Sequence, residues 1–296
     1  MAFWTTILLS AAIVSIASIG LFLHISSGQL NPGMAPFVGL GGYVSGALCV
    51  NSGLSAWLSM PIAVVAGFAF GSLFAFITLR LHHWFFAVTT LTLSVASVSG
   101  VGMIDYFGGP VGLTNIPLAT SPALIVSAFA GVLLVAYALH KSSVGLQIRA
   151  MGDDEPLSQV FGVHVRTMRI LVFGLGSAMA ALSGALQAHR FGIYEPSDLG
   201  FMQSLLLFIY VIVGGKRSVF GPVLGTFFLF VMPEVINISA QTQLLVFGAL
   251  MVIVSIWMPE GLAGALAALW RRLGPGRAGA RRTGRANALP HAGAHE

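Results

Sequence analysis

Charged side chains are scarce in this sequence. Asp, Glu, Lys and Arg make up 8% of its 296 residues, and 56% of the chain is hydrophobic. None of the four charged types occurs in residues 1–79. A water-soluble domain carries about 25% charged residues, so a soluble globular protein is excluded. Because a bilayer accepts only helices or closed barrels, the long apolar runs predict an all-α, polytopic transmembrane bundle.

Signals for chemistry are also lacking. Cys49 is the only cysteine, so no internal disulfide can form. The best candidate for a phosphate-binding loop, Gly215-Lys216, is followed by Arg217 and has Tyr210 where the motif needs glycine, so we expect no ATP bound in that way. No HExxH motif occurs and the eight histidines are scattered, so no metal site is expected. No nucleophile stands beside a base in a recognisable motif, and we expect no enzymatic activity.

Nine apolar segments approach the length of about 20 residues that crosses a bilayer. They lie near residues 3–25, 34–50, 57–79, 84–104, 123–139, 170–189, 201–214, 219–232 and 243–258. We therefore predict about nine crossings within a membrane domain of residues 1–270. An arginine-rich, disordered tail is predicted at 271–296.

The basic residues of the short loops predict the orientation. Cytoplasmic loops are enriched in Lys and Arg. Nine crossings with the N-terminus outside place nearly all the Lys and Arg residues of this chain on the cytoplasmic side. Those residues are Arg80, Lys141, Arg149, Arg166, Arg169, Lys216, Arg217 and the six arginines of the tail. Arg190 violates the rule, but Glu195 and Asp198 lie close to it in sequence. We therefore predict that the loop at 140–169 and the tail are cytoplasmic, with the tail on anionic lipid rather than on nucleic acid.

Two apolar regions are rich in glycine and proline. Residues 28–46 hold six glycines and two prolines, and residues 108–117 are similarly broken. Irregular backbone survives in a membrane only where protein or a water-filled cavity covers it, and it points to a transport pathway. The alternative is that these glycines let helices pack closely. The predicted path residues are Gly33, Phe37, Gly39, Gly41, Thr89, Thr92, Gly109 and Gly112.

The predicted membrane interior carries no formal charge. Every Asp and Glu falls at the end of an apolar segment or in a loop, whereas a carrier driven by protons or sodium usually places acids at mid-membrane. The path therefore suits a net-neutral or zwitterionic solute. Energy would have to come from another protein, which directs attention to the polar loop.

A dense polar stretch, residues 145–169, interrupts the apolar chain. Asp153, Asp154 and Glu155 begin a short helix there, and Gly162 ends it. Leu157, Val160 and Phe161 fall at i, i+3 and i+4, which makes a small apolar face. This face is too short to span a bilayer and too apolar to stay in water. We predict that it docks on a partner; the alternative is that it packs on the chain's own helix ends.

Several stretches resemble the permease subunits of ATP-binding-cassette importers of the branched-chain amino acid class. The resemblance covers about residues 20–265, and residues 145–162 are similar to that family's cytoplasmic coupling loop. The other stretches are Gly28-Gln29-Leu30, Arg80-Leu81 with Trp84-Phe85-Phe86-Ala87, Gly108-Gly109 with Gly112-Leu113 and Ile116-Pro117, and Gly214-Gly215 with Gly221-Pro222 and Gly225. The chain departs from the family pattern at residues 31–36, where Asn-Pro-Gly-Met-Ala-Pro replaces Ser-Leu-Gly-His-Ala-Ala.

The resemblance implies a function and a set of partners. It implies a permease of the bacterial inner membrane that moves branched-chain amino acids, with a second, different or identical permease beside it. Two separate subunits would bind ATP and Mg²⁺, a periplasmic protein would deliver the solute, and this chain would bind no cofactor. The alternatives are a urea, amide or other amino-acid permease of the same class, and a secondary carrier.

Overall fold

The computed structural model describes the backbone of residues 2–78, 80–81, 83–215, 218–236, 242, 245–249, 251–252 and 261–264. The predicted span at 243–258 lies largely outside the described residues. Lys216, Arg217 and the tail at 271–296 lie wholly outside them.

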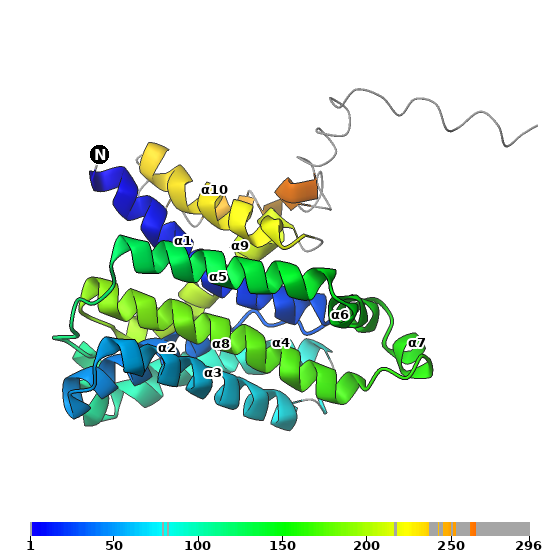
Figure 1. Ribbon diagram of the computed structural model, residues 1–296, viewed down its shortest axis with the longest axis horizontal. Helices are drawn as coiled ribbons and strands as arrows, with labels where there is room; N and C mark the ends of the chain where they lie inside the picture. Colours follow the sequence, from blue (N-terminus) through cyan, green and yellow to red (C-terminus); the bar gives the residue numbers. More distant parts are fainter. Residues whose placement is uncertain are drawn as a thin grey trace, which may run out of the picture.

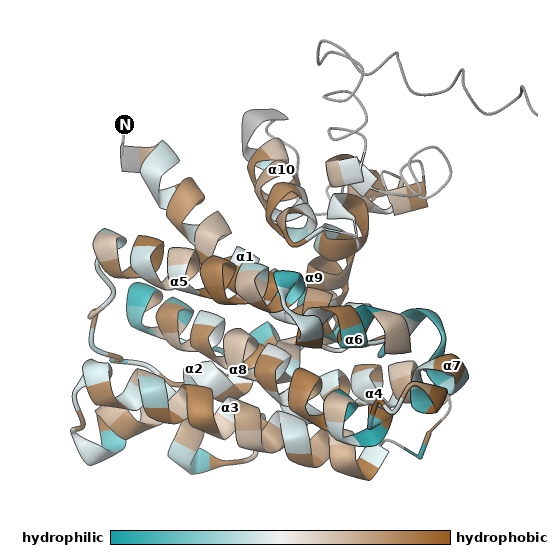
Figure 2. Cartoon of the chain, turned by 45° about the vertical axis from the view of Figure 1, so that its right-hand side comes forward, coloured by the Kyte–Doolittle hydropathy of each residue, from teal (hydrophilic) through white to brown (hydrophobic). Residues whose placement is uncertain are grey.

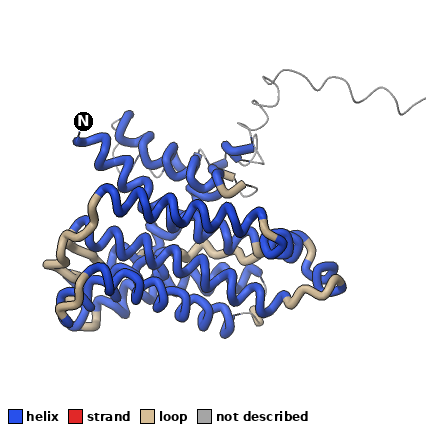
Figure 3. The backbone as a smooth tube through the Cα atoms, in the orientation of Figure 1, coloured by secondary structure: helices blue, strands red, loops and turns tan. Residues whose placement is uncertain are grey.

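Ten α-helices and three short 3-10 helices make up the described part of the chain, and no β-strand occurs in it. Figure 3 shows how little of this part is loop. The α-helices are α1 (Ala2–Ser26), α2 (Ala35–Ser52), α3 (Ala56–Thr78), α4 (His83–Gly102), α5 (Pro122–Lys141), α6 (Ser143–Asp153), α7 (Glu155–Val160), α8 (Val165–Phe191), α9 (Phe201–Gly214) and α10 (Phe220–Ile236). The 3-10 helices are η1 (Asp105–Phe107), η2 (Gly109–Val111) and η3 (Pro196–Leu199). The predicted all-α fold is confirmed.

Five helices are long and apolar enough to cross a membrane. They are Phe3–Ser26, Ala56–Thr78, Trp84–Gly102, Pro122–Lys141 and Val165–Phe191, and two shorter apolar helices span Phe201–Gly214 and Phe220–Pro233. The multi-pass prediction is therefore confirmed, whereas the count of about nine crossings stays a prediction.

Helix α8 lies at the centre of the bundle and packs against α1, α2 and α3 (Figure 1). Small residues make this close packing possible. A Cβ atom on Gly20 of α1 would overlap the carbonyl of Gly176, and one on Gly184 would overlap the carbonyl of Val38. In a membrane, where lipid is as apolar as leucine, such close backbone approach supplies much of the attraction between helices.

An aromatic cluster fills the space beside α8. The ring of Phe173 lies 5.3 Å from that of Phe37 on α2, 5.9 Å from that of Phe74 on α3, and 5.8 Å from that of Phe86 on α4. Edge-to-face and offset pairs at such distances add to the stability of a core. The cluster joins four helices at one level of the bundle.

The segment at residues 28–46 differs from its prediction. Only residues 27–34 are non-helical, and from Ala35 onwards the glycines lie within the regular helix α2. Glycines at helix contacts gain from close packing, which outweighs their low helix propensity. The break predicted at 108–117 is confirmed, since η1 and η2 are followed there by an antiparallel bridge between Leu113 and Tyr194.

Candidate coupling helix and translocation path

Helix α7 forms where the sequence predicts a short helix. The carboxylate of Asp154 accepts a hydrogen bond from the N–H of Leu157 at 3.0 Å, and Pro156 occupies the first turn, where no N–H is needed. After Val160 the chain turns at Gly162, whose φ of +81° is in the left-handed region that glycine adopts without strain. The start and stop signals are both confirmed.

A second helix, α6, precedes α7 and was not predicted. The Oγ of Ser142 caps it by accepting a hydrogen bond from the N–H of Gly145 at 3.1 Å, and Ile148 and Met151 are buried on its inner side. Asp153 is the last residue of α6, so its assignment to the start of the coupling helix is wrong. The cap at Ser142 and the apolar spacing were the available signals.

An ion pair fixes α7 to α8, and a buried serine bonds α7 to the turn that leads into α8. The guanidinium of Arg169 lies 2.8 Å from the carboxylate of Glu155, and the Arg169 side chain is only 13% exposed. Ser158 is buried, its Oγ donates to the carbonyl of Asp154 at 2.8 Å, and its own carbonyl accepts from the N–H of Val163 at 3.1 Å. The orientation of α7 on the bundle is therefore set by contacts within the chain.

The apolar face of α7 points away from the bundle. Leu157 is 52% exposed, Val160 81% and Phe161 78%. The alternative that these side chains pack on the chain's own helix ends is therefore wrong. Figure 1 shows α6 and α7 at the end of the bundle opposite the N-terminus, and Figure 2 shows α7 as a mixture of apolar and polar residues. A partner protein could contact this face without entering the bilayer.

The predicted path residues of the first broken segment are packed inside this chain. A Cβ atom on Gly33 would overlap the backbone of Thr90, and one on Gly39 would meet the side chain of Leu199. Gly41 lies against the backbone of Ala181, and Phe37 is fully buried in the aromatic cluster. The structure thus shows helix packing at these positions, and their place in a solute path stays a prediction.

A buried polar pair, His24 and Asn31, lies beside this segment and is not indicated by any sequence motif. The side chain amide of Asn31 lies 3.0 Å from Nδ1 of His24, and Nε2 of His24 lies 2.9 Å from the carbonyl of Phe173. Since a carbonyl only accepts, Nε2 carries the proton and Nδ1 accepts from Asn31. Neither side chain is exposed, and the Oδ1 of Asn31 has no partner. Asn31 is one of the residues that depart from the family pattern.

Thr89 and Thr92 lie on the outward side of α4. Thr92 is exposed and Thr89 is partly so, and their hydroxyls donate to the carbonyls of Val88 and Phe85 at 3.0 and 2.7 Å. Ser99 is exposed further along the same helix. The outward side of α3 differs, because none of its exposed residues carries a hydroxyl. Its exposed large residues are Trp57, Leu58, Ile62, Val65, Phe70, Leu73, Phe76 and Ile77. The outward side of α3 suits lipid, whereas α4 also presents hydroxyls whose oxygens can still accept hydrogen bonds from a solute or a partner.

Gly109 and Gly112 lie in the loop at the other end of the bundle. Both have positive φ values, +58° and +83°, and a Cβ atom on Gly112 would overlap the backbone of Tyr194. Two hydrogen bonds of 2.9 Å join Leu113 and Tyr194, so this loop is tied to the segment after α8. In that segment burial raises the pKa of the Asp198 carboxyl, against the lowering effect of its bond from the N–H of Glu195.

Comparison with known proteins settles the family. The family model for the permease component of branched-chain amino acid transport systems matches residues 3–255. The chain belongs to this permease family. The family resemblance inferred from the sequence is therefore confirmed.

Named relatives lie within the same class of transporter. This permease is 27% identical over 271 residues to the high-affinity branched-chain amino acid transport system permease protein LivM of Escherichia coli, covering 80% of this chain and 64% of LivM. It is 28% identical over 150 residues to LivH of Salmonella typhimurium, covering 50% of this chain and 48% of LivH. The ribose import permease protein RbsC of Escherichia coli is 24% identical over 264 residues, covering 81% and 80%. No solved structure matches the chain.

Family membership confirms the broad assignment. The relatives are permease subunits rather than enzymes, and the apolar helices of this chain agree with a multi-pass protein of the inner membrane. The chain spans slightly less than two thirds of the length of LivM.

Proposed function

We propose that this chain is the membrane-spanning permease of an ATP-driven importer for branched-chain amino acids. The observation that carries the proposal is the exposed apolar face of Leu157, Val160 and Phe161 on a helix that Glu155 and Arg169 hold at one end of the bundle. An apolar face of this kind outside a bilayer indicates a protein partner. Two ATP-binding subunits, each using ATP and Mg²⁺, are the partners proposed for it.

The contacts of α6 and α7 offer a route by which a movement of α7 would reach the membrane. The pair between Glu155 and Arg169 would pull on the first turns of α8. Gly152, near the end of α6, lies against the linker between α1 and α2, since a Cβ atom on Gly28 would be 3.2 Å from the Cα of Gly152. A displacement of α7 would thus act on α8 and on the linker together.

The outward side of α4 is the proposed boundary of the solute path. Its hydroxyls, including that of Thr92, would face a second permease, identical or different, rather than lipid. A path between two such surfaces holds hydroxyls and backbone dipoles but no formal charge, which suits a zwitterion whose two charges cancel. A periplasmic binding protein would deliver the solute at the end of the bundle that carries Gly112.

A sugar permease is the second candidate. The observation that favours it is the extent of the similarity to RbsC. The matched region covers 80% of the length of RbsC, whereas it covers 64% of the length of LivM. A neutral sugar also needs no charged group in the path. Uptake of radiolabelled leucine and of labelled ribose by cells that express the complete transporter would separate the two, and ribose uptake without leucine uptake would overturn the amino-acid assignment.

The experiment that tests the coupling role is Phe161→Ala in the reconstituted transporter. Burying a phenylalanine side chain contributes about 1.5 to 3 kcal/mol, so we expect ATPase binding to weaken by tenfold or more. Because Phe161 contacts solvent in the isolated chain, the melting temperature of the permease alone should stay unchanged.

Leu134→Ala is the matched control, since Leu134 is 71% exposed on α5 but lies away from α7. It should alter neither ATPase binding nor solute-stimulated ATP hydrolysis. If Phe161→Ala leaves both at the parent level, α7 is not the coupling helix.

A further inference from the structure

A groove beside α7 gathers arginines from two distant parts of the chain. Arg80, after α3, and Arg166 and Arg169, at the start of α8, line it together with His164 and Glu155. Its volume is about 570 Å³, which is large enough for a small polar group. The three arginines and the one carboxylate together give the lining a formal charge of +2.

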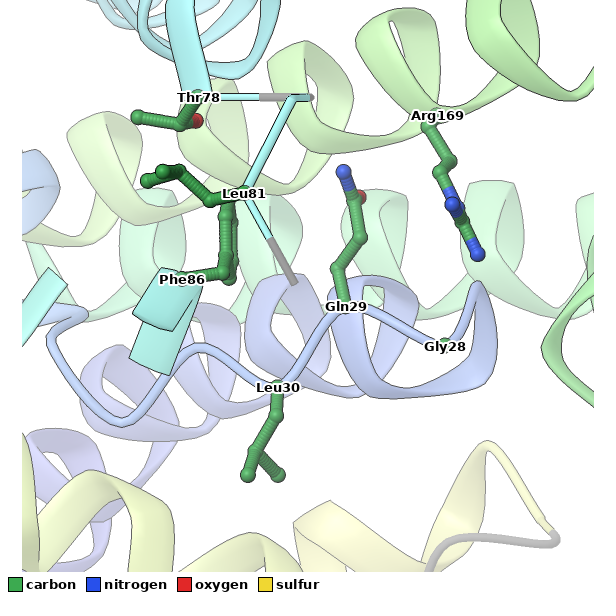
Figure 4. Close-up of a pocket in the computed structure, with 7 residues that line it drawn as sticks. All are labelled: Gly28, Gln29, Leu30, Thr78, Leu81, Phe86 and Arg169. Carbon is green, nitrogen blue, oxygen red and sulfur yellow. The ribbon is translucent and has the colours of Figure 1, made fainter. Parts of the chain in front are cut away.

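Two of the three arginines are available to a ligand. Arg169 reaches inward and is paired with Glu155, and Figure 4 shows it beside Gly28 and Gln29 of a small neighbouring pocket. Arg80 and Arg166 are exposed, and no carboxylate of the described residues lies within ion-pair distance of either. Planar guanidinium groups bind phosphate oxygens in pairs of parallel hydrogen bonds. Gln159 and Thr167 add further donors to the lining.

The surroundings of these arginines belong to the lipid-facing surface. The guanidinium of Arg166 lies 5.3 Å from the ring centre of Phe76, which is exposed on α3. Trp84, four residues after Arg80 in the sequence, is also largely exposed. Exposed aromatic rings at the ends of membrane helices are typical of the headgroup region of a bilayer. The groove therefore opens where lipid headgroups lie.

We propose that this groove binds the phosphate of an anionic phospholipid, with Arg80 and Arg166 as the ligands of the headgroup. Basic pockets between the ends of membrane helices recognise acidic lipids in this way. The acyl chains would lie along Phe76 on the outward side of α3. A lipid is favoured over a docked protein because Arg166 lies over Phe76, an exposed aromatic side chain on the apolar outward side of α3.

The test is the affinity of the purified full chain for phosphatidylglycerol, measured by native mass spectrometry in neutral detergent. Each basic residue near a membrane surface contributes about 1 kcal/mol of attraction. Removing both charges in Arg80→Gln/Arg166→Gln should therefore weaken phosphatidylglycerol binding about thirtyfold, which equals about 2 kcal/mol. Phosphatidylcholine, which has no net charge, should bind the parent and the variant equally weakly.

Lys141→Gln is the matched control, because Lys141 is an exposed cation at the same end of the bundle but on α5. It should keep the phosphatidylglycerol affinity within about twofold of the parent. An unchanged affinity in the double variant, or an equal loss in Lys141→Gln, would overturn the site. An unchanged melting temperature in phosphatidylcholine nanodiscs shows that the double variant is folded.

Two further arms separate the lipid from other occupants. Inorganic phosphate, added at the concentration of the lipid, should not displace phosphatidylglycerol; full displacement would make the groove a site for soluble anions. The purified ATP-binding subunit should bind the double variant as it binds the parent. A loss of that binding with unchanged lipid affinity would replace the lipid by a protein contact. Neither arm depends on transport, so the lipid site and the proposed function can fail separately.

Discussion

At Gly41 a hydrogen atom is the largest side chain that fits between α2 and α8. A Cβ atom there would overlap the carbonyl oxygen, the carbonyl carbon and the Cα of Ala181. Gly100, on α4, has no heavy atom within 4 Å of the same position. Both glycines lie within regular helices, so the two positions differ only in what surrounds them.

Gly41→Ala should lower the stability of the permease by about 1 to 3 kcal/mol, because one added methyl group in a tightly packed interface forces the helices apart. Gly100→Ala is the matched control and should be neutral or slightly stabilising, since alanine favours a helix. The melting temperature and the folded yield in detergent measure both effects. If Gly41→Ala melts like the parent but transports poorly per folded molecule, then Gly41 acts in the solute path rather than in packing.

Individual residues were predicted best where local chemistry decides their role. Asp154 and Gly162 were found from the sequence because a cap and a helix stop depend on near neighbours. The contact of His24 with Phe173 joins positions 149 residues apart, and no local sequence pattern predicts it. The packing of Gly41 likewise depends on a distant helix.

At the scale of the element, a single side chain caps the N-terminus of α7. Asp154 accepts the bond from the N–H of Leu157, whereas no hydrogen bond to the Asp153 side chain occurs in the described structure. The two neighbouring carboxylates therefore make a matched pair. Asp154→Ala should destabilise α7 by about 1 kcal/mol, and Asp153→Ala should not.

Hydrogen exchange of the amides at residues 157–161 measures this difference. Exchange in Asp154→Ala should be about fivefold faster than in the parent, which corresponds to about 1 kcal/mol. Exchange in Asp153→Ala should match the parent. Equal acceleration in both variants would mean that general charge at the helix start, rather than the specific cap, stabilises α7.

Apolar length predicted the long helices well, because membrane spans are set by hydrophobicity alone. Helix α3, for example, was predicted at 57–79 and spans Ala56–Thr78. The glycines of residues 28–46 were misleading, since the sequence does not tell a glycine that breaks a helix from one that lies at a contact. Helix α6 was not predicted, because only Ile148 and Met151 mark its short apolar side among mostly polar neighbours.

At the scale of the whole molecule, the two ends of the bundle have different characters. One end gathers Arg80, Arg149 and Arg169 with the exposed helix α7, and the other holds the tied loop with Gly112 and Tyr194. Figure 1 shows α6 and α7 far from the end that holds the N-terminus. The basic end is predicted to be cytoplasmic.

Single-cysteine labelling in a Cys49→Ala background tests that orientation. Cys49 is buried, so its removal should expose no new surface. Val111 and Ser197 are exposed at the predicted outer end, and Asp153 is exposed at the predicted inner end. They are better probes than Gly112 or Gly152, where a side chain would overlap the neighbouring backbone.

In intact cells, a membrane-impermeant maleimide should label Val111→Cys and Ser197→Cys, because both lie in the predicted outer loops. Asp153→Cys should react only after the membrane is opened, and a cysteine in the tail at 271–296 should behave like it. Labelling of all positions in opened membranes is the control for reactivity. Reaction of Asp153→Cys in intact cells would reverse the orientation, and would place α7 on the side where no ATP-binding subunit can reach it.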